Sequence, residues 1–221
     1  MKNVFFLFVT ALLNLNGLSQ GFINLSFENA KFTTYPFGNP FVYASNSIPG
    51  WTPYLGGVAQ DYIASNGVSL GGAGITIDGT NNSQGYVPAQ GKYFIILFGP
   101  NYGEQHLSTA IGQTAQVPLS AQSILFWSAI YGSLDVSFNG NLLPFAPAGA
   151  TANNYTLYQA NISFYAGQIG ELLFASPYGA SAIIDNIQFS SSAVPEPGTL
   201  ALVALGASLL GLRRRRNSRE F

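Results

Sequence analysis

The sequence predicts an all-β protein: a two-sheet β-sandwich, jelly-roll-like, with an N-terminal signal peptide and a C-terminal transmembrane helix. Short segments rich in β-branched and aromatic residues follow one another between the two ends, and glycine and proline separate them. No amphipathic helical period interrupts this series. Around ten strands in a single domain favour two packed sheets.

The predicted organisation has five parts. They are a signal peptide at 1–19, a β-sandwich extracellular domain at 20–190, a Ser/Pro linker at 191–198, a transmembrane helix at 199–212 and a basic cytoplasmic tail at 213–221.

The N-terminus has the pattern of a signal peptide. Lys2 gives it a positive charge, and the apolar run at 4–13 is too short to span a bilayer. Gly17 and Ser19 are the small residues expected before a cleavage site. We therefore expect export by the Sec machinery and a mature chain that begins near Gln20.

Several segments of the domain give clear strand signals. The nearly continuous apolar run at 92–98 is typical of a central strand, and 123–131 is rich in β-branched and aromatic residues. Segments 134–138 and 142–145 flank Asn139-Gly140, which suits a type I′ turn, so they predict a β-hairpin. The other strands are predicted at 22–27, 155–164, 170–174 and 181–189.

Charge and cysteine content exclude several classes of function. Residues 20–193 contain two basic and seven acidic side chains, a net charge of −5, so we expect no nucleic-acid binding. The chain has no cysteine, which excludes disulfides, thiolate metal sites and cysteine nucleophiles.

The C-terminal end has three parts in a fixed order. Pro195, Glu196 and Pro197 follow a serine-rich spacer, an uncharged and largely apolar segment occupies 199–212, and an arginine cluster follows it. As a helix, the apolar segment would extend about 21 Å, less than the roughly 30 Å of a hydrocarbon core. The arginines nevertheless favour a membrane anchor whose end lies in the cytoplasm. The cluster consists of Arg213, Arg214, Arg215 and Arg216.

This order resembles the PEP-CTERM sorting signal of Gram-negative bacteria. The resemblance implies recognition by an exosortase, a membrane-embedded processing enzyme, followed by removal of the tail and delivery to the cell surface. It also implies that Pro195, Glu196 and Pro197 are the recognition motif, and it often accompanies exopolysaccharide production. An ordinary tail anchor is the alternative.

The domain resembles the galactose-binding-like jelly rolls that include many carbohydrate-binding modules. The matching stretches are Asn24-Leu25-Ser26-Phe27-Glu28, Ile48-Pro49-Gly50-Trp51, Ile111-Gly112-Gln113-Thr114, Ala121-Gln122-Ser123-Ile124-Leu125-Phe126 and Ile184-Asp185-Asn186-Ile187. The resemblance implies a structural Ca²⁺ ion between the first and last strands, with Glu28 and Asp185 among its ligands. The alternative is that Glu28 and Asp185 are ordinary acids at strand ends that accept hydrogen bonds from turns.

Tyrosines in the expected loops are the candidate sugar-binding residues, because an aromatic ring can cover the apolar face of a pyranose. Trp51 and Trp127 lie in expected core strands, so we interpret both as packing residues. The candidate ligand-binding residues are Tyr54, Tyr62, Tyr86, Tyr102 and Tyr178.

No catalytic constellation is recognisable in the sequence. His106 is the only histidine, and the carboxylates are scattered. Gly67-Val68-Ser69-Leu70-Gly71 has the Gly-x-Ser-x-Gly spacing, but a nucleophile elbow needs a helix after the motif, and no helix is expected there. We therefore predict a non-catalytic surface or extracellular-matrix protein whose domain binds exopolysaccharide. A purely structural or adhesive protein without a sugar site is the alternative, and a secreted glycan-active enzyme is the third hypothesis.

Overall fold

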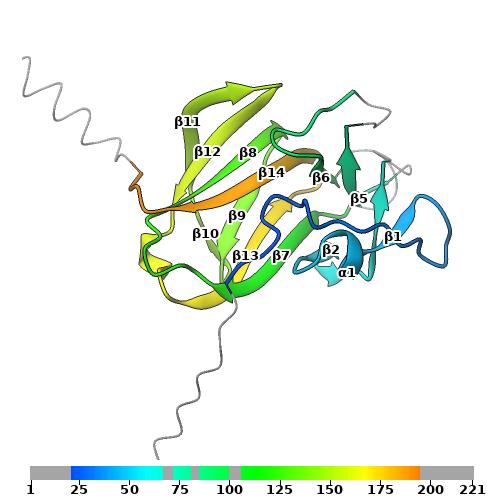
Figure 1. Cartoon of the computed structure of the whole chain (residues 1–221), viewed down its shortest axis with the longest axis horizontal. Helices are drawn as coiled ribbons and strands as arrows, with labels where there is room; N and C mark the ends of the chain where they lie inside the picture. Colours follow the sequence, from blue (N-terminus) through cyan, green and yellow to red (C-terminus); the bar gives the residue numbers. More distant parts are fainter. Residues whose placement is uncertain (1–20, 67–71, 81–84, 100–105, 195–221) are drawn as a thin grey trace, which may run out of the picture.

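The computed structural model describes residues 21–66, 72–80, 85–99 and 106–194, and they form two β-sheets packed face to face (Figure 1). This confirms the predicted all-β sandwich. The predicted signal peptide, transmembrane helix and basic tail lie outside the described residues. Within the described part, no helix has the length and hydropathy needed to cross a membrane.

The larger sheet has eight strands and the smaller sheet has six. In spatial order, the larger sheet contains β1 (Phe41–Tyr43), β4 (Tyr62–Ser65), β5 (Gly74–Gly79), β6 (Tyr93–Gly99), β14 (Ala180–Ser190), β8 (Ser123–Tyr131), β12 (Tyr155–Asn161) and β11 (Phe145–Ala152). The smaller sheet contains β10 (Asn141–Leu142), β9 (Asp135–Phe138), β13 (Ile169–Ser176), β7 (Thr109–Gln116), β2 (Thr52–Leu55) and β3 (Val58–Ala59). The helical elements are α1 (Ala44–Ser47) and the 3₁₀ turn η1 (Ser163–Tyr165).

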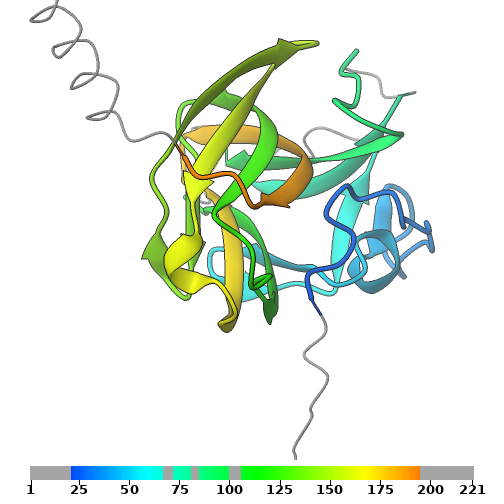
Figure 2. The same cartoon turned by 60° about the vertical axis from the view of Figure 1, so that its left-hand side comes forward.

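The chain passes repeatedly between the two sheets, as expected of a jelly-roll-like sandwich. After β6 in the larger sheet it enters β7 in the smaller one, returns to β8, and later crosses again through β13 to β14 (Figures 1 and 2). Aromatic rings join the layers: the Phe174 ring on β13 lies 5.2 Å from the Phe126 ring on β8 and 6.3 Å from the Trp51 ring. Trp51 is buried in this core, as the sequence predicted.

The structure confirms the predicted β-hairpin. Strands β9 and β10 pair antiparallel, and Asn139 and Gly140 between them have φ angles of 48° and 75°. These two positive values are what a type I′ turn requires. The second arm is shorter than predicted, because Phe145 belongs to β11 in the larger sheet.

The strand predicted at 22–27 does not form. Asn24 and Phe27 have φ angles of 50° and 62°, in the left-handed region that no strand adopts. The Gln113 side chain replaces a neighbouring strand: its Oε1 accepts a hydrogen bond from the Ile23 N–H at 2.7 Å, and its Nε2 donates to the Ile23 carbonyl at 3.0 Å. A polar side chain thus satisfies backbone groups that a ladder would otherwise pair.

The larger sheet is apolar on both faces. Ile95 and Leu97 of β6 face the core between the sheets, whereas the alternate residues Phe94 and Ile96 face away from the smaller sheet. We call this second side the outer face. It carries a separate buried cluster made of Phe94, Ile96, Ala129, Tyr155 and Ile183, against which Tyr86, Ala89, Phe98 and Trp127 pack.

Candidate functional site

A pocket of about 210 Å³ lies on the outer face of the larger sheet. Three neighbouring strands build it, because β-ladder pairing places Ser181 of β14 between Phe98 of β6 and Tyr131 of β8. Two residues further along β14, Ile183 pairs with Ile96 and contributes the apolar floor. Tyr86, from the segment that leads into β6, completes the lining.

The two tyrosines of the pocket are linked. Their side chains form a hydrogen bond, and the Tyr86 ring meets Phe94 in an edge-on arrangement at 6.5 Å. Burial, followed by this hydrogen bond to Tyr131, raises the pKa of Tyr86, so its hydroxyl stays protonated at neutral pH. Tyr131 itself is half exposed. The pocket therefore presents aromatic rings and hydroxyl groups together and no charged side chain in its lining.

Two buried acids lie on the same face of the sheet. Asp78 follows the inward-facing Ile77 on β5, and Asp185 follows the inward-facing Ile184 on β14. Both side chains are fully buried. Asp78 Oδ2, Asp185 Oδ1 and the hydroxyl of Tyr155 have no hydrogen-bond partner among the described residues.

Burial governs the protonation of this group. It raises the pKa of Asp185 to about 7, even though N–H groups of Gln90, Asn186 and Ala89 act in the opposite direction. Burial also raises the pKa of Asp78, and the charges of Asp185 and Asp78 add to burial in raising the pKa of Tyr155. Because neither carboxylate reaches the surface, neither can contact a substrate as a glycosidase acid or base would.

Glu28 and Asp185, the predicted calcium ligands, both contact the segment 89–93. Glu28 Oε1 accepts hydrogen bonds from the N–H groups of Lys92 and Tyr93 at 2.8 and 3.0 Å, and Asp185 Oδ2 accepts one from Gln90 at 2.9 Å. The charge of Glu28 also contributes to the raised pKa of Asp185. These contacts place the first and last acidic residues of the described chain beside one segment.

The residues fit a calcium ion in one respect. Asp185 Oδ1 is a buried oxygen without a partner, which is the type of ligand that Ca²⁺ prefers. However, N–H donors already occupy Glu28 Oε1 and Asp185 Oδ2. In the described ranges, no three His, Asp or Glu side chains are placed to hold a metal together. Calcium binding through Glu28 and Asp185 stays a prediction.

The candidate tyrosines do not form one site. Tyr86 lines the pocket, whereas the hydroxyl of Tyr54 on β2 donates to Glu171 Oε1 at 2.8 Å in the smaller sheet. Tyr178, in the turn between β13 and β14, has its ring 4.3 Å from that of His106. Tyr102 lies outside the described residues.

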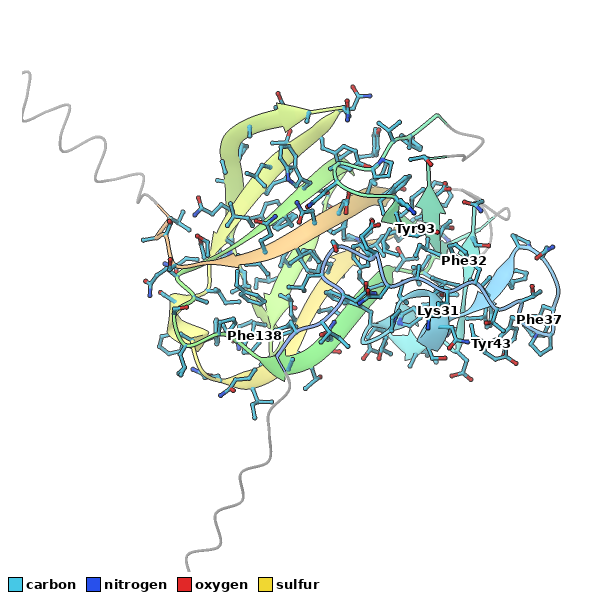
Figure 3. All side chains as sticks on the ribbon, in the orientation of Figure 1. Lys31, Phe32, Phe37, Tyr43, Tyr93 and Phe138 are labelled. Atoms are coloured by element: carbon cyan, nitrogen blue, oxygen red, sulfur yellow. The ribbon has the colours of Figure 1, made fainter. Side chains whose placement is uncertain are left out.

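Tyr62 belongs to a separate aromatic surface at the β1 edge of the larger sheet. The ring centroids within it lie 4.8 to 6.1 Å apart, and Phe37 is 67% exposed. Figure 3 shows Phe37 and Tyr43 at the end of the domain away from the last described residues, which follow β14. We call it the edge cluster, made of Tyr35, Phe37, Phe41, Tyr43 and Tyr62.

The C-terminal residues 193–216 match the family model of the PEP-CTERM protein-sorting motif. The chain carries a PEP-CTERM sorting motif. The predicted recognition residues Pro195, Glu196 and Pro197 and the arginine cluster all fall within the matched range. The motif indicates an exported protein that has a C-terminal membrane anchor and is processed by an exosortase.

The chain is similar in structure to two carbohydrate-binding modules. TmCBM61, solved with β-1,4-galactotriose, is 12% identical with a TM-score of 0.40, and the match covers 78% of this chain and 99% of that one. The family 11 module of Clostridium thermocellum, solved with a β-1,3-1,4-mixed-linked tetrasaccharide, is 11% identical with a TM-score of 0.36, covering 65% and 90%. No curated protein matches the sequence.

Sequence reasoning missed Phe98, Tyr131 and Ser181 as pocket residues. A signal for them was present in the apolar run at 92–98, which does not alternate. Such a run indicates that both faces of a strand are covered or apolar, and here the second face carries the pocket. Tyr131 ends a similar run at 123–131.

Proposed function

We propose that the PEP-CTERM protein is displayed at the surface of a Gram-negative bacterium after exosortase removes its tail, and that its sandwich binds polysaccharide without catalysing a reaction. The observation that supports binding is the outer-face pocket, which Phe98, Tyr131 and Tyr86 line together with Ser181. A concave site with apolar walls and a few placed polar groups is typical of small-ligand sites.

The lining matches the surface of a sugar ring. A pyranose offers an apolar C–H face to an aromatic ring and hydroxyl groups to the phenols and the serine. The pocket is smaller than the roughly 300 Å³ of a typical small-molecule site, so it suits one ring of a chain. The net charge of −5 over residues 20–193 repels acidic polymers, and we therefore expect a neutral glycan.

We expect weak binding at each site. Aromatic packing contributes about 0.5–1.5 kcal/mol per ring beyond area burial, and each hydrogen bond adds a similar net amount. A single site should therefore have a Kd in the micromolar to millimolar range, about −8 to −4 kcal/mol. Display of many copies on one surface would supply avidity.

A glycan array probed with the secreted, processed protein tests this function. We expect retention on neutral glycans by the wild type and loss of retention by Tyr131→Ala. Val58→Ala is the matched control, because Val58 is 65% exposed but lies on β3 of the smaller sheet. If no glycan is retained, or if Tyr131→Ala is retained like the wild type, the pocket is not a sugar site.

A structural or adhesive role without a sugar site is the second candidate. The edge cluster is the observation that favours it, because its exposed rings form a surface patch separate from the pocket. An array without any retained glycan, combined with surface display, would support this candidate. Release of shortened chains from a polysaccharide would instead support the third candidate, a glycan-active enzyme.

We also propose that a calcium ion stabilises the domain through Glu28 and Asp185. A cation there would supply electrostatic attraction to two neighbouring carboxylates. The chain's own contribution is to hold these acids beside the segment 89–93, which follows Tyr86 and leads into β6.

A further inference from the structure

Three segments meet at the end of the sandwich from which the C-terminal tail departs. The Gln122 N–H donates to the Ser190 carbonyl at 2.8 Å, and Ser123 Oγ donates to the Ser192 carbonyl at 2.7 Å. The Val117 N–H donates to the Gln168 carbonyl at 2.9 Å. We call this region, made of 117–122, 162–169 and 190–194, the exit end; in Figure 1 it lies at the C-terminal end of β14.

The exit end exposes large apolar side chains. Leu119 is 83% exposed, Phe164 is 81% exposed and Ile169 is 60% exposed. Leu119 lies against the backbone of Gly167, where even a Cβ atom would meet it, so the first two segments form one surface. Exposed apolar side chains gathered on one surface indicate a contact site.

The same surface carries no charge. None of the three segments contains Asp, Glu, Lys, Arg or His, although residues 20–193 carry a net charge of −5. The nearest acids in the sequence are Glu171, which accepts a hydrogen bond from Tyr54 within the smaller sheet, and Glu196 of the sorting motif. Charged groups are costly at membrane depth, so an uncharged apolar surface is the kind that can enter the headgroup region.

The short link between the domain and the apolar segment at 199–212, which we call the tether, limits how far this surface can lie from the membrane. Val194 is the last described residue, and the apolar segment at 199–212 begins five residues later. Five residues span at most about 17 Å when fully extended. While the tail is attached and inserted, Val194 must therefore stay within that distance of the bilayer, which keeps the exit end on the membrane side of the domain.

We propose that the exit end rests on the bilayer in the anchored precursor, with Leu119, Phe164 and Ile169 in the headgroup region. This inference rests on the proposed membrane anchoring through 199–212. The contact would hold Pro195, Glu196 and Pro197 at the membrane surface, within reach of a membrane-embedded processing enzyme. Removal of the tail ends the tether, and the domain then leaves the membrane because three side chains alone bind weakly.

Single-cysteine labelling of the full chain tests the contact. Because the protein has no cysteine, Leu119→Cys and Phe164→Cys each create one labelling position for an environment-sensitive fluorophore. Phe37→Cys is the matched control, since Phe37 is also exposed and lies at the opposite end of the domain (Figure 3). In phosphatidylcholine vesicles, we expect blue-shifted emission and loss of quenching by an aqueous quencher at 119 and 164 only.

The outcomes distinguish a failure of the proposed bilayer contact from a failure of the proposed membrane anchor. If the chain does not float with the vesicles, the anchor fails, and with it the basis of the inference. If the chain floats but labels at 119 and 164 are quenched as strongly as at 37, the bilayer contact is overturned. Protection that appears only after exosortase is added would also overturn it, because the surface would then belong to a protein partner. A melting midpoint equal to that of the wild type verifies that each cysteine variant folds. If Phe164→Cys does not fold, the comparison of Leu119→Cys with Phe37→Cys alone tests the contact.

Discussion

The carboxylates of Glu28 and Asp185 hold one short segment between them. Glu28 accepts N–H hydrogen bonds from Lys92 and Tyr93, and Asp185 accepts one from Gln90. This segment connects Tyr86 of the pocket to β6, which carries Phe98. Two acids from opposite ends of the domain's sequence thereby fix the segment that links two lining residues of the pocket.

Calcium should raise the thermal stability of the domain. A ligand that binds only the folded state stabilises it by about 2.7 kcal/mol at one hundred times its Kd. We expect a higher melting midpoint in millimolar calcium than in chelator, with no such difference in Glu28→Gln or Asp185→Asn. Equal midpoints for the wild type would rule out a stabilising site of useful affinity.

In chelator, the free energy of unfolding should fall as the pH rises toward 7 and above. Burial raises the pKa of Asp185 to about 7 in the folded chain, above its usual value of 3.8. Between these values the folded chain holds a proton that the unfolded chain has lost, so stability decreases with increasing pH. The full effect is on the order of 4 kcal/mol, at about 1.4 kcal/mol per pH unit. Denaturant unfolding at pH 4 to 8 measures it.

Asp185→Asn should flatten this pH dependence, because the amide cannot titrate. Asp135→Asn removes an exposed carboxylate from β9 and serves as the matched control. A slope that is the same in Asp185→Asn and the wild type would show that Asp185 is not its source.

Most of the fold follows from local patterns. The turn at Asn139-Gly140 needs only two residues that tolerate positive φ, and the runs at 92–98 and 123–131 need only strand length and apolar or β-forming residues. The segment 22–27 fails for a non-local reason. Its backbone bonds to the side chain of Gln113, ninety residues away, and no local pattern contains that information.

The pocket was harder to predict than the strands. Phe98, Ser181 and Tyr131 become neighbours only because β14 pairs with both β6 and β8. A sequence shows which residues alternate along a strand but not which strands are adjacent. Of the predicted tyrosines that the structure describes, Tyr86 alone lines this pocket.

Replacing Pro195, Glu196 and Pro197 by alanine should prevent processing. The motif model covers these residues, and the apolar segment at 199–212 should then hold the precursor in the inner membrane. Membrane fractionation measures the uncut protein. The control Ser191→Ala alters the linker at 191–198 and leaves the motif intact. Surface delivery of the triple variant at the wild-type level would show that sorting does not depend on this motif.

Among the candidate tyrosines, Tyr86→Ala should weaken glycan binding most. It removes one ring from the pocket and the hydrogen bond to Tyr131, which together correspond to about a tenfold loss of affinity. Tyr86→Phe keeps the ring and loses only the hydroxyl, so it should retain part of the affinity.

Variants of the other candidate tyrosines test whether the sugar site is the pocket or another surface of the domain. Tyr54→Phe removes a hydrogen bond to Glu171 in the smaller sheet, so it should affect stability and leave binding intact. Tyr178→Ala should also bind normally, because its ring contacts His106 and does not line the pocket. Loss of binding in Tyr62→Ala alone would indicate that the sugar site is the edge cluster and not the pocket. Tyr102→Ala is the fifth variant of the set of candidate tyrosines. Affinity electrophoresis in the host polysaccharide measures all five, and unchanged migration of every variant would contradict a sugar site built on these tyrosines.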